Sequence, residues 1–201
     1  FSIPLKLTEL QQIPLRSFTA TAFPKMSKAS MEGKVNVLKS LFHTYSGALT
    51  YLFFFISIIT FVFAKEFVML ISGFQYLNQD IVGYNIIALV RILSVYGLLL
   101  PIDRMTGIGL DSINKPNINA LKVMVMLGAN IIGDLIAVFV FNSLEFVAIS
   151  TLVFTSIGIG FGSYFLNKEF KISFIEIFYS ANRFYNNLWS KISNEFKILL
   201  N

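Results

Sequence analysis

Long apolar runs alternate with short polar segments along this chain. Two runs, Ser40–Ala64 and Phe146–Asn167, contain no Lys, Arg, Asp or Glu, and two others, Ile81–Ile102 and Ala120–Phe141, each carry one charge near mid-length. A helix needs about 20 predominantly apolar residues to cross a bilayer. The pattern therefore predicts four membrane spans, at about 44–64, 81–102, 120–141 and 146–166, and a more polar fifth span at about 1–22.

The composition supports the same class of protein. Hydrophobic residues make up 55% of the chain and charged residues only 13%, with a mean hydropathy of +0.70. Soluble globular domains are rarely so apolar. We therefore predict an all-α, polytopic helical membrane protein with a transmembrane lobe over residues 1–167 and a tail over residues 168–201. The chain has no cysteine, which excludes disulfides and thiol chemistry.

Basic residues are abundant and scarce in alternate loops. Segment 23–43 holds four lysines, segment 65–80 holds one, the turn after the third span holds three basic residues, segment 142–145 holds none, and the tail is basic again. The positive-inside rule places the basic loops and the C-terminus in the cytoplasm. This distribution accounts for the net charge of +5 without nucleic acid as a partner.

Arg91 and Asp134 lie near mid-depth of the third and fourth spans. Their numbers are symmetric about position 112.5, inside the polar turn 111–119 that joins these spans. Residues symmetric about a short turn lie level in antiparallel helices, and a long Arg side chain covers an offset of about one helical turn. A charge at the centre of a span costs about 2.5–3.5 kcal/mol and usually has a partner. We therefore predict a coupling or structural ion pair between Arg91 and Asp134.

The first predicted helix carries a polar stripe on one face. Its residues recur at spacings of three and four: Lys6, Glu9, Gln12, Arg16 and Thr19. A polar stripe on a membrane helix usually lines a cavity, so Lys6, Gln12 and Arg16 are the candidate substrate-binding residues. Two alternatives remain: an amphipathic helix on the membrane surface, and a purely structural ion pair between Lys6 and Glu9.

Three flanking features complete the predicted organisation. Pro24 is expected to end the first helix, because proline cannot continue the helical hydrogen-bond pattern. His43, the only histidine, is interpreted as an interfacial side chain that reaches the headgroups, with a proton relay as the alternative. Apolar residues at helical spacing from Phe170 to Leu199 predict an amphipathic helix on the cytoplasmic membrane surface, anchored by Trp189.

Motifs for covalent or metal chemistry are missing from the sequence. It contains no phosphate-binding loop, no HExxH pair and no Ser/His/Asp set, and one histidine leaves few routes to acid–base catalysis. We therefore expect no enzyme activity, no cofactor and no metal. A transporter needs only a polar path that selects a ligand and opens to either side in turn.

Several short motifs resemble a known family. The segments FSIPLKLTELQQIPL, FPKMSKA and GLDSINKPNINALK, with the apolar hairpin and the last, glycine-bearing span, are similar to the C-terminal half of bacterial polysaccharide flippases. These belong to the multidrug, oligosaccharidyl-lipid and polysaccharide exporter superfamily. The resemblance covers residues 1–166.

This resemblance implies a location, a partner and an activity. It implies a multi-pass protein of the bacterial inner membrane that moves undecaprenyl-diphosphate-linked oligosaccharide between leaflets by alternating access, for synthesis of surface polysaccharide such as O-antigen or capsule. It further implies that the five spans form most of the second lobe of a two-lobe flippase, with an N-terminal lobe as a partner in addition to membrane lipids. The start at Phe1, inside a span, suggests a fragment of a longer protein.

Two other functions remain open. A cation-coupled multidrug antiporter of the same superfamily would be expected to present acidic groups to its substrate, whereas the first helix offers two bases and one acid. A noncatalytic membrane scaffold would use Arg91 and Asp134 only to set the helix register.

Overall fold

The computed structural model describes residues 2–73 and 85–199, with side chains for 12–71, 73 and 85–194. Within these residues the fold is entirely helical, which confirms the predicted class. Its helices are α1 (Ser2–Met31), α2 (Val35–Val62), α3 (Ala64–Ser72), α5 (Ile86–Ser112), α6 (Pro116–Phe139), α7 (Leu144–Asn167) and α8 (Phe174–Leu199).

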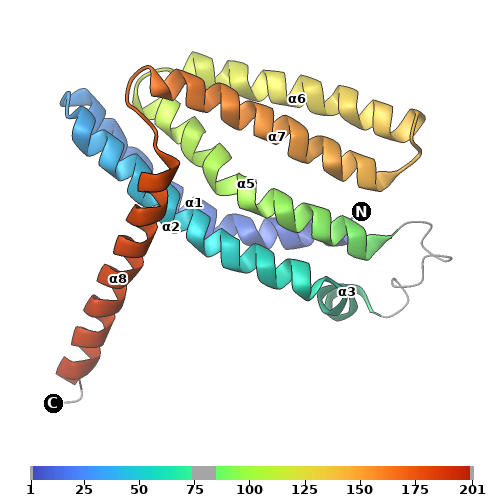
Figure 1. Cartoon of the computed structure of the whole chain (residues 1–201), viewed down its shortest axis with the longest axis horizontal. Coiled ribbons are helices and arrows are strands. Elements are labelled where there is room, and N and C mark those ends of the chain that lie inside the picture. The colour runs from blue at the N-terminus through green and yellow to red at the C-terminus, as the bar shows by residue number, and fades with distance from the viewer. Residues whose placement is uncertain (1, 74–84, 200–201) are drawn as a thin grey trace.

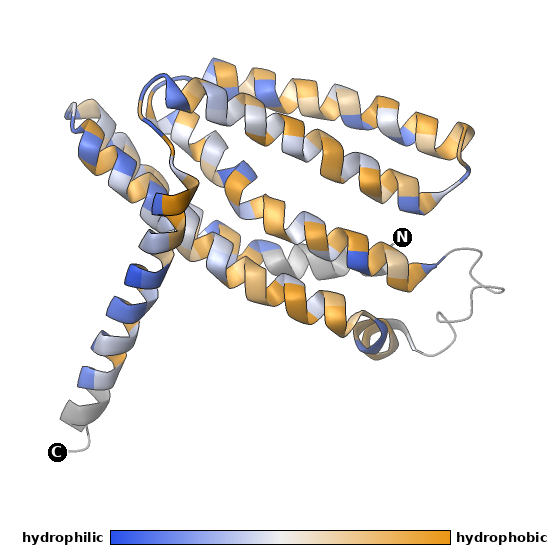
Figure 2. Ribbon diagram, viewed as in Figure 1, coloured by the Kyte–Doolittle hydropathy of each residue, from blue (hydrophilic) through white to orange (hydrophobic). Residues whose placement is uncertain are grey.

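Four of these helices, α2, α5, α6 and α7, are long and apolar enough to cross a membrane. They correspond to the four apolar runs, so the chain is a polytopic helical membrane protein. Apolar residues cover most of their length in Figure 2. Among the described residues, α1 is not one of the helices that are long and apolar enough to span a membrane.

The first helix is longer than predicted. Pro24 lies inside α1, which continues to Met31, so the prediction that this proline ends the helix is wrong. Met26 and Ala29, which follow the proline, are both buried against the rest of the bundle. We attribute the continuation to this packing, which offsets the backbone hydrogen bond that proline cannot make.

The helices also extend beyond the predicted spans at the turn between α5 and α6. The helix α5 passes through Pro101 and ends at Ser112, and α6 starts with Pro116 as its first residue, so the turn shrinks to residues 113–115. Asn114 adopts a positive φ of 59° there, and the Lys115 N–H donates to the Leu110 carbonyl at 2.9 Å. Asn114 is therefore the kind of left-handed residue that commonly ends a helix, and Pro116 then starts the next helix.

The helices α5, α6 and α7 are not arranged as a simple hairpin of α5 and α6 followed by α7 would be. The helix α7 packs along both α5 and α6, and α5 and α6 contact each other only over a short stretch. Figure 1 shows α7 between them over most of their length. Gly162 permits this close packing, because a Cβ there would lie 3.1 Å from the Thr106 Cβ on α5 and 3.3 Å from the Lys122 Cδ on α6.

The main core lies among α1, α2 and α5, with contributions from α7 and from the start of α8. By contrast, only Lys122 and Ala137 are buried on α6. We call the end of the bundle that holds residues 113–115 the turn end. The loop between α1 and α2 and the link between α7 and α8 lie at the same end (Figure 1), and Lys115 pairs with Glu169 of that link.

Candidate functional site

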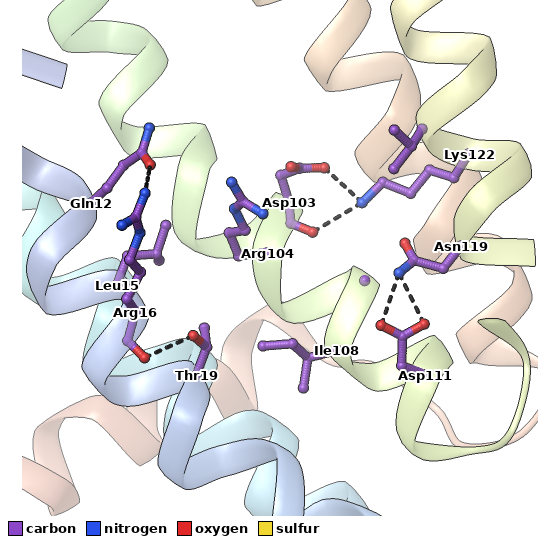
Figure 3. Close-up of a pocket in the computed structure, with 12 residues that line it drawn as sticks. Gln12, Leu15, Arg16, Thr19, Asp103, Arg104, Ile108, Asp111, Asn119 and Lys122 are labelled. Carbon is purple, nitrogen blue, oxygen red and sulfur yellow. Dashed lines mark hydrogen bonds and ion pairs between the residues drawn. The ribbon is translucent and has the colours of Figure 1, made fainter. Parts of the chain in front are cut away.

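A polar pocket of about 400 Å³ opens between α1, α5 and α6 near the turn end (Figure 3). Its lining combines three basic residues, two carboxylates and two amides with smaller apolar and hydroxyl-bearing groups. The lining residues are Gln12, Leu15, Arg16, Thr19, Asp103, Arg104, Gly107, Ile108, Asp111, Asn119, Lys122 and Val123. The three chain segments that meet here are the middle of α1, the last turns of α5 and the first turns of α6.

The wall formed by α1 contains part of the predicted polar stripe. Gln12, Arg16 and Thr19 all line the pocket, while Leu15 between them is buried and packs into the core. The Arg16 guanidinium donates to the Gln12 Oε1 at 3.2 Å, and the Thr19 hydroxyl donates to the Arg16 carbonyl at 3.0 Å. The spacing of three and four residues puts these groups on one face, and the hydrogen bond to Gln12 orients the guanidinium.

A buried ion pair forms the opposite wall. The Lys122 ammonium lies 2.6 Å from the Asp103 Oδ1, and it donates to the Asp103 carbonyl at 2.9 Å and to the Thr106 hydroxyl at 3.0 Å. The Lys122 side chain is 2% exposed and that of Asp103 is 20% exposed. The ammonium therefore has two hydrogen-bond acceptors and one carboxylate oxygen in ion-pair contact, which are the kinds of partners that a buried lysine needs.

A carboxylate–amide pair lies between that ion pair and the turn. The Asn119 Nδ2 on α6 donates to both carboxylate oxygens of Asp111 on α5, each at 3.0 Å. Gly107 leaves the room for this amide, since a Cβ there would lie 3.1 Å from the Asn119 Oδ1. Together with the Lys122 pair, this contact holds the first turns of α6 against the last turns of α5.

Arg104 completes the cationic part of the pocket. It is exposed and forms no ion pair or hydrogen bond with another described side chain. Arg16 is also exposed, whereas the charges of Asp103 and Lys122 compensate each other. The guanidinium groups of Arg16 and Arg104 are therefore the cations in this pocket that an anionic ligand can reach.

The structure describes the side chains of two of the three predicted substrate-binding residues. Gln12 and Arg16 line the pocket. The Lys6 side chain lies outside the described residues, as does that of Glu9, so the predicted role of Lys6 and the alternative ion pair remain predictions.

Arg91 and Asp134 do not pair. The Arg91 guanidinium lies over the Phe61 ring of α2, 5.5 Å from its centroid, and the Asp134 carboxylate accepts a hydrogen bond of 2.6 Å from the Ser150 hydroxyl of α7. The physical reason is the position of α7, which separates α5 from α6 away from the turn end. The prediction of a coupling or structural ion pair between Arg91 and Asp134 is therefore wrong.

His43 is likewise not an interfacial side chain that reaches the headgroups. It is buried; its Nδ1 lies 3.0 Å from the Glu176 Oε2 and its Nε2 accepts from the Ser173 N–H at 3.2 Å. Since Nε2 is an acceptor, Nδ1 carries the ring proton. The side chain therefore ties α2 to the start of α8.

The Asp103–Lys122 pair was not predicted, although a usable signal was present. These two residues are symmetric about the same position, 112.5, as Arg91 and Asp134. The sequence pattern groups Lys122 with the basic residues of the turn and puts Asp103 just beyond the third predicted span, 81–102. Helix ends that extend into the turn bring both residues inside the bundle.

Comparison with other proteins identifies no relative. No protein-family model matches the chain, and neither the curated proteins nor the solved structures contain a significant match. The function is therefore argued from the pocket and from the sequence patterns.

Proposed function

We propose that this chain is part of a flippase that moves a lipid-linked diphosphate oligosaccharide across the bacterial inner membrane. The observation that carries the proposal is a pocket of about 400 Å³ beside membrane helices, in which Arg16 of α1 and Arg104 of α5 present guanidinium groups. A diphosphate offers paired oxygens, and guanidinium binds such pairs through two parallel hydrogen bonds.

The position of the pocket supports loading from the cytoplasmic side. It lies near the turn end, which also carries the lysine-bearing loops between α1 and α2 and between α7 and α8. Under the positive-inside rule this end is cytoplasmic. Lipid-linked oligosaccharides that are assembled on the cytoplasmic leaflet would meet the pocket there.

The remaining polar groups suit the saccharide. Asp111 and Asn119 offer oxygen acceptors and an amide beside the two arginines, and sugar hydroxyl groups both donate and accept hydrogen bonds. The Asp103–Lys122 pair carries no net charge, so it shapes the wall without competing strongly for the diphosphate. In this proposal the phosphates bind toward Arg16 and Arg104 and the first sugar toward Asp111 and Asn119.

The chemistry of the cations weighs against the multidrug antiporter. A cationic drug would meet the exposed guanidinium groups of Arg16 and Arg104, and the two carboxylates already have Lys122 and Asn119 as partners. The scaffold alternative loses its main support, because Arg91 and Asp134 are not paired. Transport of an anionic substrate is the function that these contacts favour.

The test uses cells whose surface glycan depends on the native protein. Arg16→Gln combined with Arg104→Gln should greatly reduce the amount of lipid-linked saccharide that a membrane-impermeant lectin can reach on the outer surface, and the saccharide should accumulate inside. Arg183→Gln is the matched control, because it removes an exposed arginine of α8 that does not line this pocket. Normal surface exposure in the double variant, at normal protein abundance, would overturn the proposal.

A further inference from the structure

The helix α8 crosses α2 with almost no space between the two backbones. A Cβ at Gly47 of α2 would collide with the Ile177 carbonyl, and it would lie 2.9 Å from the Ala181 N on α8. The Tyr185 hydroxyl then donates to the Ala48 carbonyl at 2.8 Å. Figure 1 shows α8 leaving the bundle across the direction of α2. The position of α8 along α2 is therefore set by Gly47.

Two pockets of opposite character flank this crossing. On the side of the first turns of α2, a polar pocket of about 420 Å³ is lined by residues that include Lys39, Ser40, Tyr179 and Arg183. Here Glu176 of α8 accepts a charged contact from Lys39 at 3.0 Å. On the side of the later turns of α2, a groove of about 430 Å³ is lined almost entirely by apolar side chains.

The apolar groove, which we call the α2–α8 groove, is walled mainly by aromatic residues. Its principal lining residues are Tyr51, Phe54 and Phe55 of α2, Ile102 of α5, and Phe174 and Phe178 of α8. Beyond the groove, the exposed surface of α2 continues with large apolar side chains as far as Val62. Since α2 is long and apolar enough to be a membrane span, this surface faces hydrocarbon.

The change from polar to apolar lining places the boundary between water and hydrocarbon along α8. Three side chains of α8 illustrate this arrangement. They have similar exposed fractions, which are 69% for Ile175, 68% for Phe178 and 66% for Tyr179. Of the three, only Phe178 lines the groove and only Tyr179 lines the polar pocket. Water in the groove would contact a surface with almost no hydrogen-bonding groups. The apolar solvent that surrounds a membrane span consists of lipid chains.

We propose that the α2–α8 groove is a binding site for one acyl chain of a membrane phospholipid. The chain lies beneath α8 against Phe54, Phe55 and Phe178, and the headgroup lies at the level of α8, where Lys171 is exposed to meet its phosphate. This inference is independent of the proposed transport function. It gives α8 the role of a helix at the membrane surface that holds a lipid against the lobe.

The environment of each flank can be measured directly because the chain contains no cysteine. Single variants Phe178→Cys, Tyr179→Cys and Ile175→Cys of the full chain are labelled with a fluorophore and placed in vesicles of phosphatidylcholine and phosphatidylglycerol. Acyl chains brominated near mid-length should quench the Phe178→Cys label several-fold more strongly than the Tyr179→Cys label, and aqueous iodide should give the reverse order. Equal quenching of the two labels, or strong iodide quenching at position 178, would overturn the proposal.

Mass spectrometry of the chain in detergent distinguishes a phospholipid bound in the α2–α8 groove from the bulk lipid that surrounds the spans. The wild-type chain should retain a phospholipid that is lost from Phe54→Ala/Phe178→Ala, whereas the equally exposed Ile175→Ala should keep it. If the wild-type chain retains no phospholipid, or if it forms a dimer that Phe178→Ala dissociates, then lipid is not the occupant. Circular dichroism and elution volume show whether each variant is folded, and the labelling experiment supplies an answer that does not need the alanine variants.

Discussion

Two pairs of opposite charges are arranged symmetrically about the same turn, yet only one of them forms an ion pair. Nearer the turn, the Lys122 ammonium is buried in the pocket wall and lies 2.6 Å from the carboxylate of the partly exposed Asp103. Arg91 and Asp134, farther away, bind instead to the Phe61 ring and the Ser150 hydroxyl. A hairpin therefore places charges level but does not keep its two helices in contact. Beyond the first turns, α7 occupies the space between them.

The largest expected effect is the loss of one partner of the buried pair. Asp103→Leu leaves the Lys122 ammonium buried without its carboxylate, which should lower the free energy of unfolding by about 3 kcal/mol, the lower end of the range for such pairs because Asp103 borders the open pocket. Titration with SDS in mixed micelles measures this quantity. A change below about 1 kcal/mol would mean that the pair contributes no more than an exposed one.

Double-mutant cycles compare the two pairs on the same scale. We expect a coupling free energy of about 1–3 kcal/mol between Asp103→Leu and Lys122→Met, because the groups are in contact. For Arg91→Met and Asp134→Leu the single effects should add within about 0.5 kcal/mol. A coupling of similar size in both cycles would show that the outer pair also interacts and would contradict the position of α7.

The packing of α7 can be tested with two glycines of the same helix. Gly162→Ala should lower the free energy of unfolding by about 1 kcal/mol, since its Cβ meets Thr106 and Lys122 at 3.1 and 3.3 Å. Gly160→Ala is the matched control, because nothing lies within 4 Å of a Cβ there, and it should be neutral or slightly stabilising. The same SDS titration measures both, and equal effects would refute the close contact at Gly162.

The smallest effect on stability is expected from the ion pair between Lys39 and Glu176, at the junction of α2 and α8. Lys39 donates a hydrogen bond to Glu176 and thereby lowers the pKa of that carboxyl, with a smaller contribution from His43, the other titratable group that faces it from α2. A lowered pKa means that the contact stabilises the docked α8 above the ordinary carboxyl range and is lost as the pH falls through the folded-state pKa.

The protection factors of the α8 amides, which are exchange rates corrected for their intrinsic dependence on pH, should therefore fall slightly in acid, and Glu176→Gln should remove this fall. The matched control is Glu169→Gln, which removes an exposed partner of Lys115 and leaves the junction of α2 and α8 intact. If α8 in the Glu176→Gln variant still responded to acid as the wild type does, another group would be responsible.

The fold was largely predictable, because a span is specified by a long apolar run and four such runs are present. The stripe residues Gln12 and Arg16 were predictable for a similar reason: helical spacing alone puts them on one face. The residues across the pocket could not be predicted in this way. Asp103, Arg104 and Lys122 lie where the apolar runs change to the polar turn, so whether they line the pocket depends on how far each helix extends. The separation of Arg91 from Asp134 depends on packing by a third helix, which residue spacing within a hairpin does not encode.

The proposed function requires that Arg16 and Arg104 form an anion site. Isothermal titration calorimetry of the full chain in detergent, with farnesyl diphosphate and with farnesol, tests it most directly. We predict that the diphosphate binds, that farnesol binds at least about tenfold more weakly, and that Arg16→Gln/Arg104→Gln removes this preference while Arg183→Gln retains it. Equal affinity for the two ligands in the wild-type chain, or an unchanged preference in the double variant, would show that Arg16 and Arg104 do not form an anion site.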